Sequence, residues 1–181
     1  MIYMYLADGF EEVEALFPLD LFRRAGLDAK TVSITENEYV TGSHGITVKA
    51  DLTVKGEDYV PNEAELIMLP GGMPGTTNLD ASSDVHKALD YAYENGRFIA
   101  AICAAPSVLG KKGFLNGKKA TCYPGFEKYL YGRVETNEKC VRDGKIITAA
   151  GAGVALDYGL KIIETLIGKN KAEEIKNAIL A

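Results

Sequence analysis

The chain has 181 residues, of which 47% are hydrophobic and 25% are charged, close to the usage of ordinary globular proteins. This length predicts one domain spanning residues 1–181. The net charge of −5 argues against a general nucleic-acid-binding protein, because such proteins neutralise phosphates with clustered Lys and Arg. The amino-terminal segment lacks a basic region, and its apolar run is far too short to span a membrane. We therefore expect a folded cytoplasmic protein without a membrane segment.

Strand-like and helix-like segments alternate along the chain, which predicts an α/β fold with a mostly parallel sheet and helices on both faces. The expected strands are Ile2–Ala7, Ala29–Ile34, Glu65–Pro70, Phe98–Cys103 and Lys145–Ala149. The expected helices are Phe10–Ala25, Ser82–Asn95, Pro106–Gly113 and Val154–Ile167, and the chain ends in helix. Alternation in Tyr39–Val54 predicts a small β-hairpin insertion, and Asp143-Gly144 predicts a second hairpin near the end.

The first expected helix places an acidic residue among apolar side chains. At about 100° per residue, Glu14 shares a face with apolar residues, whereas Glu11 and Glu12 project away from that face. The apolar residues of this face are Phe10, Val13, Phe17 and Leu21. A buried carboxylate is destabilising unless it is hydrogen-bonded or protonated, so we expect a raised pKa or a specific partner for Glu14. The alternative is a local irregularity of the helix at Pro18.

Arg24 falls on the same face of this helix, whereas Arg23 turns away from it. An arginine on an apolar face usually meets an anion, a carboxylate or another subunit. Arg24 is therefore a candidate for a ligand site or a subunit interface. The alternative is that its side chain extends past the helix end to water.

A glycine-rich segment, Leu69-Pro70-Gly71-Gly72-Met73-Pro74-Gly75, follows the third expected strand. The small residues Gly71 and Gly72 allow backbone N–H groups to approach a ligand or a developing oxyanion. A plain surface turn is the alternative. The segment is no P-loop, because it lacks the Gly-Lys-Ser/Thr sequence.

Cys103 ends an expected buried strand, and a helix with Pro106 in its first turn follows directly. The small residues Ala101 and Ala105 fit a strained strand-to-helix elbow of the kind that presents a nucleophile. A helix amino terminus favours a thiolate over a thiol, so we expect a lowered pKa for Cys103. The alternative is an inert core cysteine, which is how we interpret Cys122 and Cys140.

The remaining residues give no sequence pattern for a metal or a cofactor. The three cysteines are widely spaced without a C-x-x-C pair, and His44 and His86 are isolated in the sequence. Gly151-Ala152-Gly153 resembles the start of a dinucleotide-binding fingerprint. However, Leu156 occupies the position of the third small residue, and no strand with a ribose-binding acid follows. We expect a protein that binds no metal and uses no cofactor.

Three segments together resemble the ThiJ/PfpI family, also called the DJ-1 superfamily. These are Ala7-Asp8-Gly9-Phe10-Glu11-Glu12-Val13-Glu14, Leu69-Pro70-Gly71-Gly72 and Ala100-Ala101-Ile102-Cys103-Ala104-Ala105-Pro106, in the family's order and spacing. The resemblance, which runs to about Gly168, implies a flavodoxin-like three-layer sandwich that forms a homodimer. It also implies that Cys103 is the nucleophile, hydrogen-bonded to a protonated Glu14, and that the N–H groups of Gly71, Gly72 and Ala104 are the oxyanion or sulfinate donors. By the same resemblance, Arg24 matches an arginine near the dimer interface and the site.

The chain departs from the family pattern at four places. Ala104 follows the cysteine where the protease-like and glyoxalase III-like branches have histidine, and Tyr123 stands where close relatives often have a histidine. The family's Arg-Gly-Pro-Gly segment reads Ala150-Gly151-Ala152-Gly153. His44 stands at the position of an anion-site arginine.

The resemblance implies a small reactive carbonyl compound as the partner of Cys103, such as methylglyoxal or its early adducts on amines and thiols. The activity would be glyoxalase- or deglycase-like, with Glu14 shuttling the proton. The alternative is an oxidative-stress sensor or a protective, chaperone-like binding protein in which Cys103 is oxidised to sulfinate. A peptidase or an amidotransferase is disfavoured, because no base is available for the leaving group.

Overall fold

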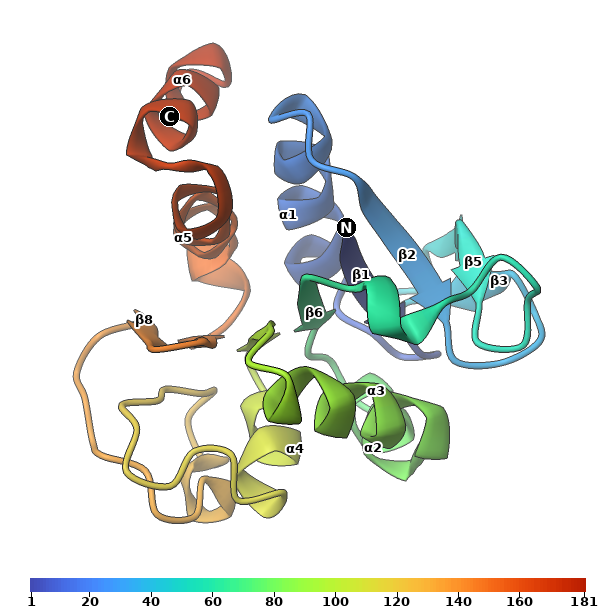
Figure 1. The fold of residues 1–181 in the computed structure, drawn as a ribbon, viewed down its shortest axis with the longest axis horizontal. Coiled ribbons are helices and arrows are strands. Elements are labelled where there is room, and N and C mark those ends of the chain that lie inside the picture. Colours follow the sequence, from blue (N-terminus) through green and yellow to red (C-terminus); the bar gives the residue numbers. More distant parts are fainter.

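A seven-stranded sheet forms the centre of the computed structural model, which describes residues 1–181 (Figure 1). The strand order is β5-β2-β1-β6-β7-β9-β8, and all neighbours are parallel except β8 and β9. The strands are β1 (Ile2–Leu6), β2 (Ala29–Ser33), β5 (Leu52–Thr53), β6 (Leu66–Leu69), β7 (Phe98–Ile102), β8 (Cys140–Asp143) and β9 (Ile146–Ala149). The central order β2-β1-β6-β7-β9 is the flavodoxin-like arrangement, so the expected fold class is confirmed.

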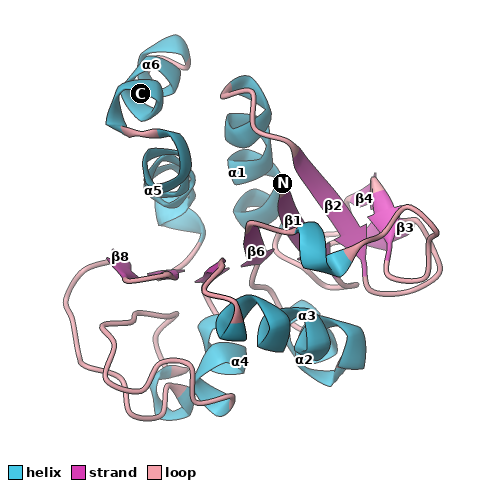
Figure 2. Cartoon of the chain, in the orientation of Figure 1, coloured by secondary structure: helices cyan, strands magenta, loops and turns pink.

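Helices cover the two faces of this sheet and complete a three-layer sandwich (Figures 1 and 2). One face carries α1 (Glu12–Arg24), α5 (Ala155–Ile167) and α6 (Lys169–Ala178). The opposite face carries α2 (Gly75–Ala81), α3 (Ser83–Glu94) and α4 (Pro106–Lys111). Short 3-10 turns lie at Pro61–Glu63, Glu127–Tyr129 and Ala152–Val154. No helix is both long enough and apolar enough to cross a membrane.

The alternation of side chains along each strand builds two separate cores. In β1, Met4 and Leu6 pack with Phe22 of α1 and residues of α5, while Tyr3 and Tyr5 pack on the opposite face with residues of α3 and α4. Every residue of β1 is buried, as expected for a parallel strand covered on both faces. Because β6, β7 and β9 run parallel, their carboxyl ends lie at the same edge of the sheet, where the loops that follow them meet.

The expected β insertion is confirmed in part. Tyr39–Thr41 (β3) and Thr47–Lys49 (β4) form a separate antiparallel pair, but β5 joins the main sheet beside β2. The Asp143-Gly144 turn joins β8 to β9, which confirms the second hairpin. The helix α2 was not expected, because Pro and Gly residues before it indicated a turn.

The buried face of α1 differs from the predicted face. Val13 and Phe17 are 47% and 36% exposed, whereas Glu12, expected outside the apolar face, is only 5% exposed. The β3–β4 hairpin contacts the start of α1 and covers Glu12, an arrangement that helix periodicity cannot indicate. Glu14 is 1% exposed, as predicted. The helix continues through Pro18, so the alternative of a local break is wrong.

Candidate functional site

Cys103 occupies a sharp elbow between β7 and α4. Its backbone φ is +62°, in the left-handed region that residues other than glycine rarely adopt. The Cys103 N–H donates to the Ala149 carbonyl at 2.9 Å, and the Tyr123 N–H donates to the Cys103 carbonyl at 2.8 Å. Ala101 and Ala105 are completely buried on either side. These contacts hold the backbone in the elbow and leave the thiol partly accessible.

The carboxyl of Glu14 lies against the Cys103 thiol. The Gly71 N–H donates to Glu14 Oε2 at 2.9 Å. Glu14 and Cys103 each shift the pKa of the other. Burial raises the pKa of Glu14 from 4.5 to about 7, although the hydrogen bonds with Cys103 and Gly71 oppose this shift. Glu14 is thus buried, hydrogen-bonded and partly protonated near neutral pH, as the sequence predicts.

The pKa of the Cys103 thiol is raised, not lowered as expected. Burial and the neighbouring Glu14 carboxylate raise this pKa to about 12, against the opposing effect of the Gly72 and Ala104 N–H groups. Cys122 and Cys140 also have raised pKa values, about 11 and about 12, because both thiols are buried. A negative charge on Glu14 and one on Cys103 repel each other, so the pair retains at least one proton near neutral pH.

Glycine is required where the β6–α2 loop passes Cys103 and Glu14. A Cβ at Gly71 would lie 2.6 Å from Cys103 Cβ and 2.6 Å from Glu14 Oε2. Gly72 has a φ of +90°, and a Cβ there would collide with the backbone of Glu11. Since the Gly71 N–H is already bonded to Glu14, the N–H groups of Gly72 and Ala104 are the ones that act on the sulfur. The Gly71 N–H, expected as an oxyanion or sulfinate donor, donates to the Glu14 carboxyl in this structure.

Arg24 does not reach this pair. Its Nε donates to Asp20 Oδ2 at 2.6 Å on the exposed side of α1, and its side chain is 52% exposed. Arg24 shares the face of Val13 and Phe17, as predicted, but this face is exposed in the single chain, so a subunit interface at Arg24 stays a prediction. The helix face was assigned with its apolar residues toward the core, whereas the exposed Val13 and Phe17 show that α1 is turned differently.

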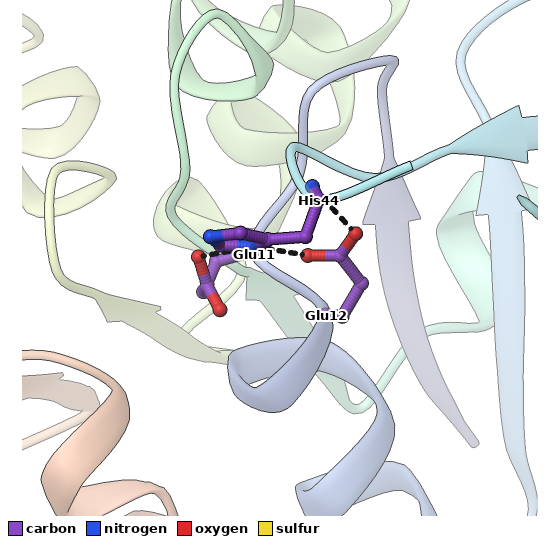
Figure 3. Close-up of side chains that lie close together, drawn as sticks. All are labelled: Glu11, Glu12 and His44. Atoms are coloured by element: carbon purple, nitrogen blue, oxygen red, sulfur yellow. Dashed lines mark hydrogen bonds and ion pairs between the residues drawn. The ribbon is translucent and has the colours of Figure 1, made fainter. Parts of the chain in front are cut away.

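His44 meets two acidic residues at the start of α1 (Figure 3). Its Nδ1 lies 2.9 Å from Glu12 Oε2 and 3.5 Å from Glu11 Oε2. Burial opposes ionisation of Glu12, but hydrogen bonds from His44 and Ile46 lower its pKa to about 2, and the pKa of His44 is raised by Glu12. The ligand atoms of the three side chains lie within 4.8 Å of one another. His44 is isolated only in the sequence, and its ion pair with Glu12 fastens the β3–β4 hairpin to α1.

Tyr123 lies beside the reactive pair, on the wall of a pocket of about 360 Å³. A Cβ added at Gly151 would lie 3.4 Å from the Tyr123 ring and 3.8 Å from Glu14 Oε1. The pocket is also lined by Lys139, which sequence reasoning missed because a lone exposed lysine carries no periodic or motif signal.

The comparisons with known proteins cover nearly the whole chain. The family model of the DJ-1/PfpI family matches residues 1–165. The chain is 35% identical over 178 residues to protein dj-1beta of Drosophila melanogaster, covering 97% of this chain and 94% of that protein. It is 37% identical over 177 residues to protein DJ-1 homolog B of Arabidopsis thaliana, of which it spans only 40%. A structure of Toxoplasma gondii DJ-1, described as oxidized, matches with a TM-score of 0.93 and 35% identity, covering 99% of this chain and 97% of that one.

Proposed function

Because the chain belongs to the DJ-1/PfpI family, we propose that it acts on reactive α-oxoaldehydes or their early adducts. Cys103 is the nucleophile and Glu14 is its proton partner in this proposal. The observation that carries it is the contact between the elbow thiol and a buried carboxyl whose pKa is about 7. A carboxyl with this pKa can accept and return a proton near neutral pH, which is the property required of a general acid and base.

The reaction begins when the thiol proton passes to Glu14. The thiolate then attacks the aldehyde carbon, a C–S bond forms, the C=O π bond breaks, and the oxygen takes the proton from Glu14. Glu14 next takes the proton from the aldehyde carbon and returns it to the neighbouring carbonyl carbon, while the hydroxyl proton passes to the oxygen of that carbonyl, and the hemithioacetal becomes a thioester. Water hydrolyses the thioester and restores the thiol. Methylglyoxal plus water thus becomes lactate without an oxidant or a reductant, and the Gly72 and Ala104 N–H groups stabilise negative charge at the site.

Lactate production from methylglyoxal over many turnovers tests this proposal, in an amine-free buffer that contains a chelator. Cys103→Ser should lower the rate at least about a hundredfold, because serine has no comparable anionic fraction near neutral pH. Cys122→Ser is the matched control, since this buried cysteine lies outside the elbow. Equal rates in the wild-type and Cys103→Ser proteins would reject the enzymatic function.

Oxidation sensing by Cys103 is the second candidate function. The partly accessible thiol next to a protonatable carboxyl and two N–H groups provides hydrogen bonds that would hold a sulfinate. The Toxoplasma gondii relative is described as oxidized. Peroxide titration followed by mass spectrometry distinguishes the candidates: a sensor gains two oxygen atoms at Cys103 at low peroxide while Cys122 and Cys140 remain reduced.

We also propose that the chain forms a homodimer in the cytoplasm. The exposed apolar side chains of Val13 and Phe17 on α1 support a contact with a second copy. The three free cysteines fit a reducing compartment.

A further inference from the structure

The pocket beside Tyr123 adjoins the reactive pair on two sides. Gly151 forms part of its wall and lies next to the Glu14 carboxyl, since a Cβ at this residue would lie 3.8 Å from Glu14 Oε1. Tyr123, on another side of the pocket, is joined to Cys103 by a backbone hydrogen bond of 2.8 Å. The pocket wall at Gly151 is therefore next to the Glu14 carboxyl, which in turn contacts the Cys103 thiol.

The wall of this pocket carries a single formal charge. Its lining residues are Tyr123, Pro124, Lys139, Ala150, Gly151, Ala152, Gly153 and Val154, and only Lys139 is ionisable near neutral pH. None of the ion pairs in the chain includes Lys139. The Ala150 N–H donates to the Lys139 carbonyl at 2.8 Å, which fixes the backbone of this lysine at the pocket. An unpaired ammonium group in a protein of net charge −5 is a local attraction for an anion.

Lys139 also borders a larger cavity of about 440 Å³ between β8, α5 and α6. Besides Lys139, that cavity carries four acidic and three basic side chains. Lys139 lies within ion-pair distance of none of these acids. No ion pair holds its ammonium group in that cavity, which leaves the group free to bind an anion in the pocket beside Tyr123.

Resting on the proposed function, we propose that this pocket selects carbonyl compounds that carry an anionic group, either a carboxylate or a phosphate. Lys139 Nζ holds the anion, the apolar part of the compound lies against the Tyr123 ring, and the carbonyl faces Cys103. Lysine binds either anion as a point charge, so both share the same chemistry. Gly153 keeps the wall open, since a Cβ at this position would meet no atom within 4 Å.

Alkylation of Cys103 by iodoacetate and by iodoacetamide tests this pocket without requiring turnover. The two reagents differ in charge and form the same C–S bond, so any change in the thiol pKa cancels in the ratio of their rates. Lys139→Gln should lower the ratio of the iodoacetate rate to the iodoacetamide rate about fivefold at low salt, an effect that added salt screens. Lys30→Gln in β2, far along the sheet, makes the same charge change and should leave the ratio unaltered. A ratio that is equal in the wild-type and Lys139→Gln proteins would overturn the proposal.

Competing anions distinguish the two sources of the negative charge. Inorganic phosphate that protects Cys103 from iodoacetamide at constant ionic strength indicates a phosphate-bearing compound, and protection by acetate indicates a carboxylate. Either protection should disappear in Lys139→Gln and in Gly153→Leu, which fills the pocket without a collision at the Cβ. Absence of protection by both anions in the wild-type protein would contradict the pocket assignment. Turnover of methylglyoxal with an unchanged alkylation ratio rejects the pocket alone, whereas a shifted ratio without turnover rejects the proposed function alone.

Discussion

Replacement of Glu14 by glutamine should change how the stability of the protein depends on pH. Glutamine keeps an oxygen that can accept the Gly71 N–H and removes the ionisable carboxyl. In the wild-type protein, burial raises the pKa of Glu14 from 4.5 to about 7. A carboxyl whose pKa is raised on folding contributes stability that is fully present below pH 4.5 and is lost as the pH rises through about 7.

The size of this effect follows from the shift in pKa. Each pKa unit corresponds to about 1.4 kcal/mol, so the change from 4.5 to about 7 corresponds to about 3 kcal/mol of unfolding free energy. Glu14 is almost fully buried, so solvent screening reduces this value little. The difference in unfolding free energy between Glu14→Gln and wild type should therefore shift by about 3 kcal/mol in favour of the variant when the pH is raised from below 4.5 to above about 7.

Urea unfolding followed by circular dichroism measures this difference from about pH 4 to about pH 8. Protein concentration is fixed throughout, because association would otherwise alter the apparent stability. Glu12→Gln is the control, since the pKa of Glu12 is lowered to about 2 and its stabilising effect is lost only as the pH falls below 4.5. Curves for wild type and Glu14→Gln that stay parallel across the whole range would refute a raised pKa for Glu14.

Three further measurements test the site and the assembly. Gly71→Ala should abolish lactate production and cost about 1–3 kcal/mol of stability, because its Cβ displaces Cys103 and Glu14, whereas Gly151→Ala makes only ordinary contacts and should be nearly neutral. Glu14→Gln should lower the pKa of Cys103, measured by thiolate absorbance, because it removes the neighbouring charge; a rise would show that Glu14 donates its proton to the thiolate. Phe17→Glu on α1 should convert a dimer to a monomer of 19.5 kDa in light scattering, and Tyr131→Glu should not; a wild-type monomer would reject the dimer.

The sheet could be predicted from the sequence because its signals are local. Apolar runs such as Phe98–Ile102 and Leu66–Leu69 are bounded by turn residues, and each forms a buried parallel strand. Local sequence does not determine which strands pair with each other. Thus β5 pairs with β2, although the sequence of β5 resembles the rest of the predicted hairpin insertion. The pairing of His44 with Glu12 could not be predicted for the same reason, because the two residues are 32 positions apart in the sequence.

The orientation of α1 could not be predicted, because two surfaces compete for its apolar residues. Helix periodicity shows which residues share a face, but not whether that face meets the core of the same chain or another subunit. Phe17 and Val13 are exposed, while Glu12 is covered by the β3–β4 hairpin. Glu14 was predicted correctly because it lies at the boundary of both surfaces, where either orientation buries it.

The electrostatics of Cys103 show why a motif alone cannot determine reactivity. The sequence places the cysteine before a helix, and a helix amino terminus lowers a thiol pKa. In the structure, burial and the contact with Glu14 outweigh the N–H groups of Gly72 and Ala104, and the thiol pKa rises. In the proposed reaction the thiolate forms only when Glu14 holds the proton, so reactivity depends on the pair and not on the cysteine alone. Substrate that enters beside Lys139 brings its own negative charge, which favours a protonated Glu14 and so links the selection of an anionic compound to the protonation state of the pair.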